Sequence, residues 1–567
     1  MALIQKAFSD IITFSRSSNA TRVGPTGLVE YAPHNLLLQS QTFDNASWLK
    51  SNSSITANAI AAPDGTVTAD KLVEAATTSV HSATQAVTFA ANFIYTASVY
   101  AKAGERSFLI IQPTGDSRFA YYNLSNGTVG TVSGSPLSTQ IQSVGNNWYR
   151  CTITVTSPGA TAANCILYSA ATDGNATYTG DGTSGIYLWG AQLSVGPYPL
   201  DYTPTTSAAV YGPRFDYDPV TLAARGLLIE EQRTNLQPYS DDFSNGVWVK
   251  DGGISVTSNA AVSPDGTQNA DFIRGTTSGT NVWVYDDGVS TGVAANTSFT
   301  NSVYAKANGV NFLYIRFEDK ANASNYVYFN LSTGTVSATV GSLSTTATIT
   351  PVGNGWYRCT VTGNSASGSG GNNMLLIGLS DASGSTYLTA SATNGIYIWG
   401  AQFEQGSFST SYIPTIASTV TRSADVASVN TLSPWWNNVE GTLFADYTAS
   451  ESSYVVIPYT DANNYMILNA GTTGSAFDVV NAGSVQASIG TRSLSAKIAA
   501  RFKSNDFAVC LNGGAVATDT AGTVPSITDR LALGYFPGVS VRINGHLRRV
   551  AFYPRALTSA ELQAITA

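Results

Sequence analysis

The feature that most constrains this chain is an internal duplication. Several peptides recur in the same order: Ser-Val-Tyr-Ala-Lys at 98–102 and 302–306, Trp-Tyr-Arg-Cys-Thr at 148–152 and 356–360, and Trp-Gly-Ala-Gln at 189–192 and 399–402. The offset grows from 200 residues between Asn35 and Asn235 to 210 between Trp189 and Trp399. Insertions of this kind accumulate in surface loops. We therefore predict two copies of one structural module.

Each copy has the pattern of short antiparallel β-strands. Residues 94–100 alternate with a period of two, and residues 108–111, 149–155 and 186–189 are runs of strand length. No helix of more than two turns is predicted in either copy. Charged residues make up 11% of the chain and hydrophobic residues 43%, which excludes disorder and long coiled coils. The predicted fold class is all-β, with tandem β-sandwich (jelly-roll) domains joined by short hairpin-like connectors.

Similar lead-ins precede the two copies, with Gly-Leu-Val-Glu at 27–30 and Gly-Leu-Leu-Ile-Glu at 226–230. They are rich in strand residues, which favours β connectors over flexible linkers. From Trp435 the pattern changes, and a capping box at Thr558 predicts a short C-terminal helix. The predicted divisions are an N-terminal attachment or lead-in segment (1–34), the first β-sandwich module (35–205), a β connector (206–234), the second module (235–416), a connector (417–434) and a last jelly-roll domain (435–567).

The four cysteines do not form a disulfide framework. Cys151 recurs as Cys359, but the position of Cys165 is taken by Met374 in the second copy. A bridge between Cys151 and Cys165 would leave Cys359 without an equivalent partner. We predict that the cysteines are small buried hydrophobic residues.

Charge and hydropathy exclude several classes of partner. The net charge is −8, and Lys and Arg form no basic stripe, so neither nucleic acid nor an anionic membrane surface is an expected partner. No apolar run reaches the ~18 residues of a membrane span. Residues 1–10 include Lys6 and Asp10 and lack the apolar region of a secretory signal peptide.

Several of these peptides resemble tailed-bacteriophage fibre and head-spike proteins. The likeness lies in Phe-Ser-Arg-Ser-Ser-Asn-Ala-Thr at 14–21, Arg-Phe-Asp-Tyr-Asp-Pro-Val-Thr at 214–221, the Trp-Gly-Ala-Gln endings and Tyr-Ile-Pro-Thr at 412–415. The C-terminal segment resembles a laminin-G or concanavalin-like lectin jelly roll through Asn-Gly-His-Leu-Arg-Arg at 544–549. The resemblance implies a virion appendage with carbohydrate-binding-like modules, made in the bacterial host cytoplasm. By analogy with phage fibres it also implies a homotrimer.

The sequence offers little sign of catalysis. His34, His81 and His546 are scattered, with no metal-binding spacing. Gly-Val-Ser-Thr-Gly at 288–292 matches GxSxG, but a strand follows it instead of the helix that a nucleophile elbow needs. We therefore expect a structural loop there.

Paired carboxylates, the other catalytic signal, are generic here. A glycosidase needs two carboxylates across one sugar cleft, whereas neighbouring residues on a strand point to opposite faces. We interpret all four pairs as surface or turn residues: Asp216 with Asp218, Glu230 with Glu231, Asp241 with Asp242, and Asp286 with Asp287. We expect no enzyme activity.

No cofactor is predicted. Asp64 and Asp265 lie in Pro-Asp-Gly-Thr turns, upstream of Asp70 and Asp271. Such oxygen-rich loops could hold a structural calcium ion. No full set of ligands can be identified from the sequence, so we predict no metal site.

The repeat sorts the nine tryptophans. Six form three pairs shared by both copies (Trp48 and Trp248, Trp148 and Trp356, Trp189 and Trp399). They are predicted to lie in the core, and a sugar-binding platform shared by both copies is the less favoured alternative. Trp283, with Tyr285 beside it, and Trp435 with Trp436 have no equivalent. Aromatic faces stack on apolar faces of ligands, so these four are the candidate carbohydrate-binding residues. For Trp435 and Trp436, packing at a domain junction is an equally good interpretation.

The favoured hypothesis is a non-enzymatic fibre or spike subunit that binds host cell-surface polysaccharide and other virion proteins. One alternative is a purely structural decoration or connector protein that binds no sugar. A second is a polysaccharide depolymerase, which would need two carboxylates in one cleft. A secreted bacterial lectin is less favoured, because no targeting segment is seen.

Overall fold

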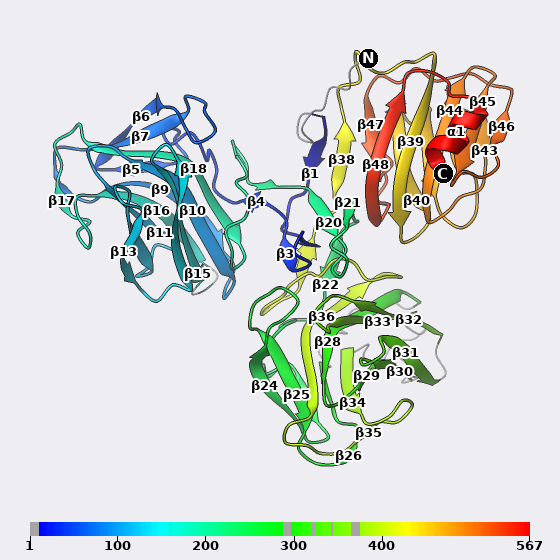
Figure 1. The fold of residues 1–567 in the computed structure, drawn as a ribbon, viewed down its shortest axis with the longest axis horizontal. Helices are drawn as coiled ribbons and strands as arrows, with labels where there is room; N and C mark the ends of the chain where they lie inside the picture. Colours follow the sequence, from blue (N-terminus) through cyan, green and yellow to red (C-terminus); the bar gives the residue numbers. More distant parts are fainter. Residues whose placement is uncertain are drawn as a thin grey trace. The chain divides into compact units, whose positions relative to one another are not determined.

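The computed structural model describes residues 11–157, 159, 161–286, 296–318, 324–341, 344–364 and 375–567. The chain divides into two compact units, one formed by residues 31–212 and the other by residues 1–30 together with 213–567. Nearly all regular structure is β, which confirms the predicted fold class (Figure 1). Within the described residues, no helix is long and apolar enough to cross a membrane.

The first unit is a sandwich of two six-stranded antiparallel sheets. Their strand orders are β14-β15-β10-β18-β7-β6 and β13-β12-β11-β16-β9-β5. The strands are β4 (His34–Asn35), β5 (Leu49–Ser51), β6 (Ser53–Ile60), β7 (Ala69–Glu74), β8 (Thr78–Ser79), β9 (His81–Phe89), β10 (Ile94–Ala103), β11 (Phe108–Gln112), β12 (Phe119–Asn123), β13 (Thr128–Ser133), β14 (Ser138–Gly145), β15 (Trp148–Thr156), β16 (Thr161–Ala170), β17 (Tyr178–Thr179), β18 (Gly185–Val195) and β19 (Val210–Tyr211).

The second module repeats this topology strand for strand. Its sheets have the orders β32-β33-β28-β36-β25-β24 and β31-β30-β29-β34-β27-β23. The strands are β22 (Arg233–Asn235), β23 (Val249–Asp251), β24 (Ile254–Ala261), β25 (Ala270–Gly275), β26 (Gly279–Thr280), β27 (Trp283–Asp286), β28 (Ser298–Asn308), β29 (Phe312–Glu318), β30 (Ser324–Asn330), β31 (Thr335–Gly341), β32 (Thr345–Pro351), β33 (Tyr357–Asn364), β34 (Leu375–Ser380), β35 (Tyr387–Leu388), β36 (Gly395–Gln405) and β37 (Val420–Arg422).

The period-two pattern builds the core of each sandwich. In β11, Leu109 and Ile111 point into the main core while Ile110 joins a separate cluster on the outer face. The six tryptophans shared by the two copies are 1–5% exposed, and all four cysteines are buried and unbridged. Both predictions are confirmed.

The last domain is a sandwich of two seven-stranded sheets with the orders β1-β38-β47-β40-β41-β42-β43 and β20-β21-β48-β39-β44-β45-β46. Its strands, with the lead-in strands beside them, are β1 (Thr13–Ser15), β2 (Thr21–Val23), β3 (Val29–Tyr31), β20 (Arg214–Tyr217), β21 (Ala224–Ile229), β38 (Val426–Val429), β39 (Glu440–Ala449), β40 (Ser453–Asp461), β41 (Asn464–Ala470), β42 (Phe477–Asn481), β43 (Ser484–Ile489), β44 (Ser495–Lys503), β45 (Phe507–Leu511), β46 (Ala517–Asp519), β47 (Arg530–Leu533) and β48 (Gly545–Tyr553).

This domain takes edge strands from segments that we predicted only as lead-ins or connectors. β1 and β38 extend one sheet, and the β20–β21 hairpin extends the other through β21 and β48 (Figure 1). Leu227 and Ile229 of β21 lie in the same hydrophobic core as Phe477 and Phe502. The predicted helix is present as α1 (Ser559–Thr566), with the capping box between Thr558 and Glu561. Segments separated by hundreds of residues thus complete one sandwich.

A buried ion network fastens these segments together. Asp425 accepts a hydrogen bond from Arg16 Nη1 at 2.9 Å and is also paired with Arg214. Glu230 Oε2 lies 2.6 Å from Nη1 of Arg214 and 2.6 Å from Nη1 of Arg422. All five side chains are at most 7% exposed. Each arginine comes from a different segment: Arg16 follows β1, Arg214 begins β20 and Arg422 ends β37.

The pKa shifts in this network follow from burial and pairing. Burial lowers the pKa of Arg16 to about 10, although Asp425 opposes the change. Burial alone would raise the pKa of Glu230, but Arg422 and Arg214 hold it well below its usual range. The stability that Glu230 contributes is therefore present above its unfolded pKa of about 4.3. It is lost as the pH falls below that value toward the folded pKa.

We predict that Asp425→Ala destabilises the second unit strongly. The change leaves Arg16 and Arg214 buried with fewer negative partners, and breaking a buried pair costs about 3–5 kcal/mol. Tryptophan fluorescence during urea unfolding would measure the shift in midpoint. The matched control is Asp446→Ala, which removes a partly exposed partner of Arg548 and should cost at most about 1 kcal/mol. Equal effects of the two changes would contradict the prediction.

Candidate functional site

The second module carries an aromatic cluster on the outward face of one sheet. We call it the outer aromatic face and define it as Trp283, Tyr285, Tyr314, Arg316, Tyr326 and Tyr328. In one row across β27, β34, β29 and β30, Trp283 lies opposite Gly378, Gly378 opposite Tyr314, and Tyr314 opposite Tyr328. In the next row Tyr285 and Arg316 flank Leu376, and Arg316 lies opposite Tyr326. Two predicted site residues, Trp283 and Tyr285, thus belong to one larger surface.

A glycine makes room for this arrangement. A Cβ atom at Gly378 would lie 2.1 Å from Cζ of Tyr314, so the Tyr314 ring can lie over β34 only because residue 378 has no side chain. The Tyr314 and Tyr328 ring centroids are 5.3 Å apart, within the range of a favourable aromatic pair. The rings therefore form a continuous layer across the sheet.

Exposure and charge distinguish the members of this face. Trp283, Tyr285 and Tyr326 are partly exposed, whereas Tyr314 and Tyr328 are buried beneath the surface. The guanidinium carbon of Arg316 lies 5.9 Å from the Trp283 ring centroid and 5.6 Å from that of Tyr326, which is cation–π geometry. Trp283 Nε1 and the Tyr314 hydroxyl are buried and have no hydrogen-bond partner among the described residues. Buried polar atoms ordinarily have a partner, so these two unpaired atoms are unusual for the interior of the layer.

Sequence reasoning missed Tyr314, Arg316, Tyr326 and Tyr328. The signal was available, because these residues occupy the alternate, outward positions of the strand patterns at 312–318 and 324–330. An outward sheet face with no other layer over it is normally polar, so aromatic residues at those positions are the anomaly to look for.

The first module has a related outer face of different composition. Tyr168, opposite Ser82, occupies the place of Gly378, and Ile110, opposite Tyr121, occupies that of Tyr314. Gln112 stands where the second module has Arg316, and its Oε1 accepts a hydrogen bond from the Tyr168 hydroxyl at 2.7 Å. The two modules therefore present different chemistry at the same position of the fold.

Trp435 and Trp436 lie elsewhere, against the core of the last domain. The Trp436 ring stacks on Phe552 at 4.5 Å and on Phe502 at 5.6 Å between centroids. Trp435 Nε1 donates to the Thr431 carbonyl at 2.7 Å, and Trp436 Nε1 donates to Asn438 Oδ1 at 2.8 Å. Both rings remain partly exposed. These contacts favour the packing interpretation, and a role in binding stays a prediction.

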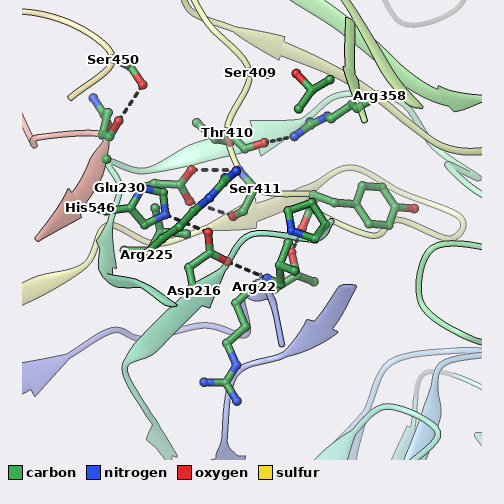
Figure 2. Close-up of a pocket in the computed structure, with 18 of the residues that line it drawn as sticks. Arg22, Asp216, Arg225, Glu230, Arg358, Ser409, Thr410, Ser411, Ser450 and His546 are labelled. Carbon is green, nitrogen blue, oxygen red and sulfur yellow. Dashed lines mark hydrogen bonds and ion pairs between the residues drawn. The ribbon is translucent and has the colours of Figure 1, made fainter. Parts of the chain in front are cut away.

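A cavity of about 300 Å³ lies within the second unit, where the lead-ins, the second module and the last domain meet (Figure 2). His546 Nε2 lies 2.8 Å from Asp216 Oδ2, and His546 Nδ1 lies 3.3 Å from the Thr448 hydroxyl. Asp216 Oδ1 also accepts the Val23 backbone N–H at 2.7 Å. Histidine and carboxylate here hold β2, β20 and β48 against one another.

The arginines around this cavity are paired within the chain. Arg22 Nη2 lies 2.9 Å from Glu30 Oε1, and Arg225 Nη2 lies 2.7 Å from Asp218 Oδ2. Arg358 Nη1 donates to the Thr410 carbonyl at 2.7 Å (Figure 2). The cationic groups that line the cavity thus already have anionic or carbonyl partners.

Three of the acidic residues predicted at the surface or in turns are instead buried: Asp216, Glu230 and Asp286. That part of the prediction was wrong, because His546, the arginine network and the Gln237 amide supply the partners that make burial tolerable. Spatial neighbours of this kind are not visible in a local sequence pattern.

Other acidic residues form the predicted turns. Asp218 Oδ1 accepts the N–H groups of Val220 and Thr221, and Asp242 Oδ1 accepts those of Ser244 and Asn245. Asp287 and the GxSxG peptide at 288–292 lie outside the described residues.

The aspartates of the Pro-Asp-Gly-Thr turns, and the buried aspartates that follow them, accept equivalent backbone hydrogen bonds in both copies. Asp64 and Asp265 each accept the N–H of the threonine two residues later. Asp70 accepts the N–H groups of Phe43 and Asn58, and Asp271 those of Phe243 and Asn259. In the part of the chain that the structure describes, no three His, Cys, Asp or Glu side chains gather as they would around a metal ion.

Two carboxyl groups of the second module are hard to ionise. Burial, followed by repulsion from Asp265, raises the pKa of Asp241 to about 7. Burial also raises the pKa of Asp271 to about 6, against the two N–H groups that it accepts. In the first module Gln41 occupies the position of Asp241, so this acidic pair is specific to the second copy.

Comparisons with known proteins give only distant likenesses. No protein-family model matches the chain, and no curated protein matches it. Among solved structures, the CBM22-1-CBM22-2 tandem domain of Paenibacillus barcinonensis Xyn10C is similar at 10% identity, with a TM-score of 0.24, over 69% of this chain and 100% of that one. Domains LG4-5 of the mouse laminin alpha1 chain are similar at 10% identity, with a TM-score of 0.18, over 55% and 96%. With TM-scores this low, neither likeness establishes a function.

We predict that Asp241→Gln stabilises the second module at pH 8 but not at pH 4. Between pH values of about 4 and about 7, Asp241 keeps its proton in the folded chain but has lost it in the unfolded chain. The free energy of unfolding therefore falls as the pH rises through this range. The expected gain at pH 8 is about 1 kcal/mol, because water reaches part of the side chain. Urea unfolding at the two pH values would measure it. The converse variant Gln41→Asp should lose stability at pH 8, and an equal gain for Asp241→Gln at both pH values would contradict the explanation.

Proposed function

We propose that this chain is a non-enzymatic subunit of a bacteriophage virion appendage, a fibre or spike that adheres to host cell-surface polysaccharide. The outer aromatic face of the second module is the proposed contact surface. The virion context rests on the sequence resemblance of the lead-ins and module endings. In this setting the chain acts as a homotrimer beside other virion proteins, after synthesis in the bacterial host cytoplasm.

The observation that carries the proposal is the composition of an outward sheet face. Trp283, Tyr285 and Tyr326 offer partly exposed rings in two neighbouring rows of residues across the sheet. The C–H faces of sugars stack on such rings.

Weak binding at one face is compatible with firm adhesion by the particle. A shallow sugar site with millimolar affinity contributes only about −4 kcal/mol. Several copies on one particle multiply effective binding by roughly 10²–10⁴ when they can engage together. A module presented in many copies therefore does not need a deep pocket.

We predict that Trp283→Ala weakens binding to the host polysaccharide at least about tenfold, or about 1.4 kcal/mol. Binding of the purified full chain to extracted host surface polysaccharides would be measured by titration, with the length of the polysaccharide followed in the same samples. Trp435→Ala is the matched control, because its ring packs on Phe552 in the last domain.

The outcomes separate the rival functions. Saturable binding that Trp283→Ala weakens, without shortening of the polysaccharide, supports adhesion through the outer aromatic face. Binding lost only in Trp435→Ala would move the site to the last domain. Shortening of the polysaccharide would indicate a depolymerase, and no binding by the native oligomer would indicate a structural decoration or connector protein.

A further inference from the structure

The same turn has different surroundings in the two modules. Each module has Pro-Asp-Gly-Thr after an edge strand, β6 or β24, beside a cluster of aromatic residues. The first-module cluster contains Trp148, Trp189, Tyr100, Tyr187 and Tyr202. The equivalent cluster of the second module contains Trp356, Trp399, Tyr304, Tyr397 and Tyr412, and it also includes Val352 and the lead-in residue Val29. Val29 comes from the N-terminal lead-in, which lies in the same unit as the second module.

In the second module the lead-in covers the turn. The Val29 N–H donates to the Pro264 carbonyl at 2.9 Å. A Cβ atom at Gly266 would meet Leu28 Cδ1 at 2.8 Å. Pro264 is buried. An extended pair of aliphatic residues, joined to the turn by one backbone hydrogen bond, thus completes this corner of the sandwich.

In the first module the same turn is open. Asp64, Gly65 and Thr66 are exposed, and a Cβ atom at Gly65 would meet nothing within 4 Å. Within the described residues, no donor lies on the Pro63 carbonyl. A pocket of about 430 Å³ remains there, and its lining includes Ala61, Pro63, Lys102, Asn146, Trp148 and Tyr187.

We propose that this pocket is a docking site for an extended segment of a partner protein. The segment presents two consecutive aliphatic side chains, as Leu28 and Val29 do, and donates a backbone N–H to the Pro63 carbonyl. Lys102, which also lines the pocket, favours an acidic residue next to the aliphatic pair. Strand-like segments commonly bind through backbone hydrogen bonds for affinity and side-chain pockets for specificity.

We infer that the segment bound in this pocket comes from a partner protein, because the described lead-in segments of this chain already pack elsewhere. Leu28 and Val29 lie on the second module, and the matching residues Leu227 and Leu228 pair with β48 of the last domain. A second copy that lent its lead-in would expose its own second module, with no net gain in buried surface. This inference does not depend on glycan binding.

The test uses a fluorescent peptide with the sequence of residues 24–31, Gly-Pro-Thr-Gly-Leu-Val-Glu-Tyr, titrated with the full chain. We expect saturable binding that is lost when serine replaces both aliphatic residues of the peptide. Ala61→Arg, which fills the mouth of the pocket from an exposed position, should weaken binding at least tenfold. The matched change Val262→Arg, at the equivalent exposed position of the covered module, should leave it unchanged.

A photo-crosslinker at the valine of the peptide locates the binding site independently. Crosslinks to residues 60–66, 146–148 or 187 support the proposal. Four results would overturn it: no saturable binding up to about 1 mM peptide, binding insensitive to Ala61→Arg, crosslinks to residues 264–267, or an oligomer of this chain alone that Ala61→Arg dissociates. The last result would assign the pocket to a second copy.

Discussion

The second unit of this protein depends on three buried arginines that share two carboxylates. Arg16, Arg214 and Arg422 come from segments about 200 residues apart, yet Asp425 and Glu230 hold all three in one place. Taking these charges out of water is costly, so the network exists only if every segment arrives together. The network therefore fixes the position of each segment, because each arginine must lie beside its carboxylate. The strands next to the arginines are held in place with them.

The consequence is a last domain that is not continuous in sequence. Its two sheets are extended by β1, by β38 and by the β20–β21 hairpin. Hydrophobic packing of Leu227 and Ile229 into the core adds non-directional stabilisation, while the ion network supplies the geometric specificity. The cavity beside His546 and Asp216 lies at the same junction, and the charged groups around it are paired within the chain.

The two modules show how a duplicated fold diverges in its surfaces while its core stays the same. The shared tryptophans are buried in both copies, and the strand orders correspond one to one. The outward faces differ, with Trp283 and Arg316 in one copy where the other has Ser82 and Gln112. The turns differ as well, since Val29 covers one and the other is open. Core positions are constrained by close packing, whereas an exposed face is free to acquire binding chemistry.

The candidate site could be predicted from the sequence only where the interacting residues lie close together along the chain. Trp283 and Tyr285 could be singled out from the sequence because the repeat gave the other tryptophans a structural explanation. Tyr314 and Tyr326 follow the same alternation but join Trp283 only through the pairing of β27, β34, β29 and β30. The burial of Asp216 and Glu230 could not be predicted, because their partners His546 and Arg422 lie 330 and 192 residues away.

The sequence by itself determined the duplication, the all-β class, the buried cysteines and tryptophans and the capped C-terminal helix. These properties depend on residue periodicity and on contacts between near neighbours, both of which are written along the chain. Only the tertiary structure decided which lead-in strand joins which sheet, which acidic residues are buried and which rings share a face. Those outcomes depend on pairing between distant segments. A buried charge is stable only beside its partner. A strand pairs with the sheet edge that is left exposed once the core has folded.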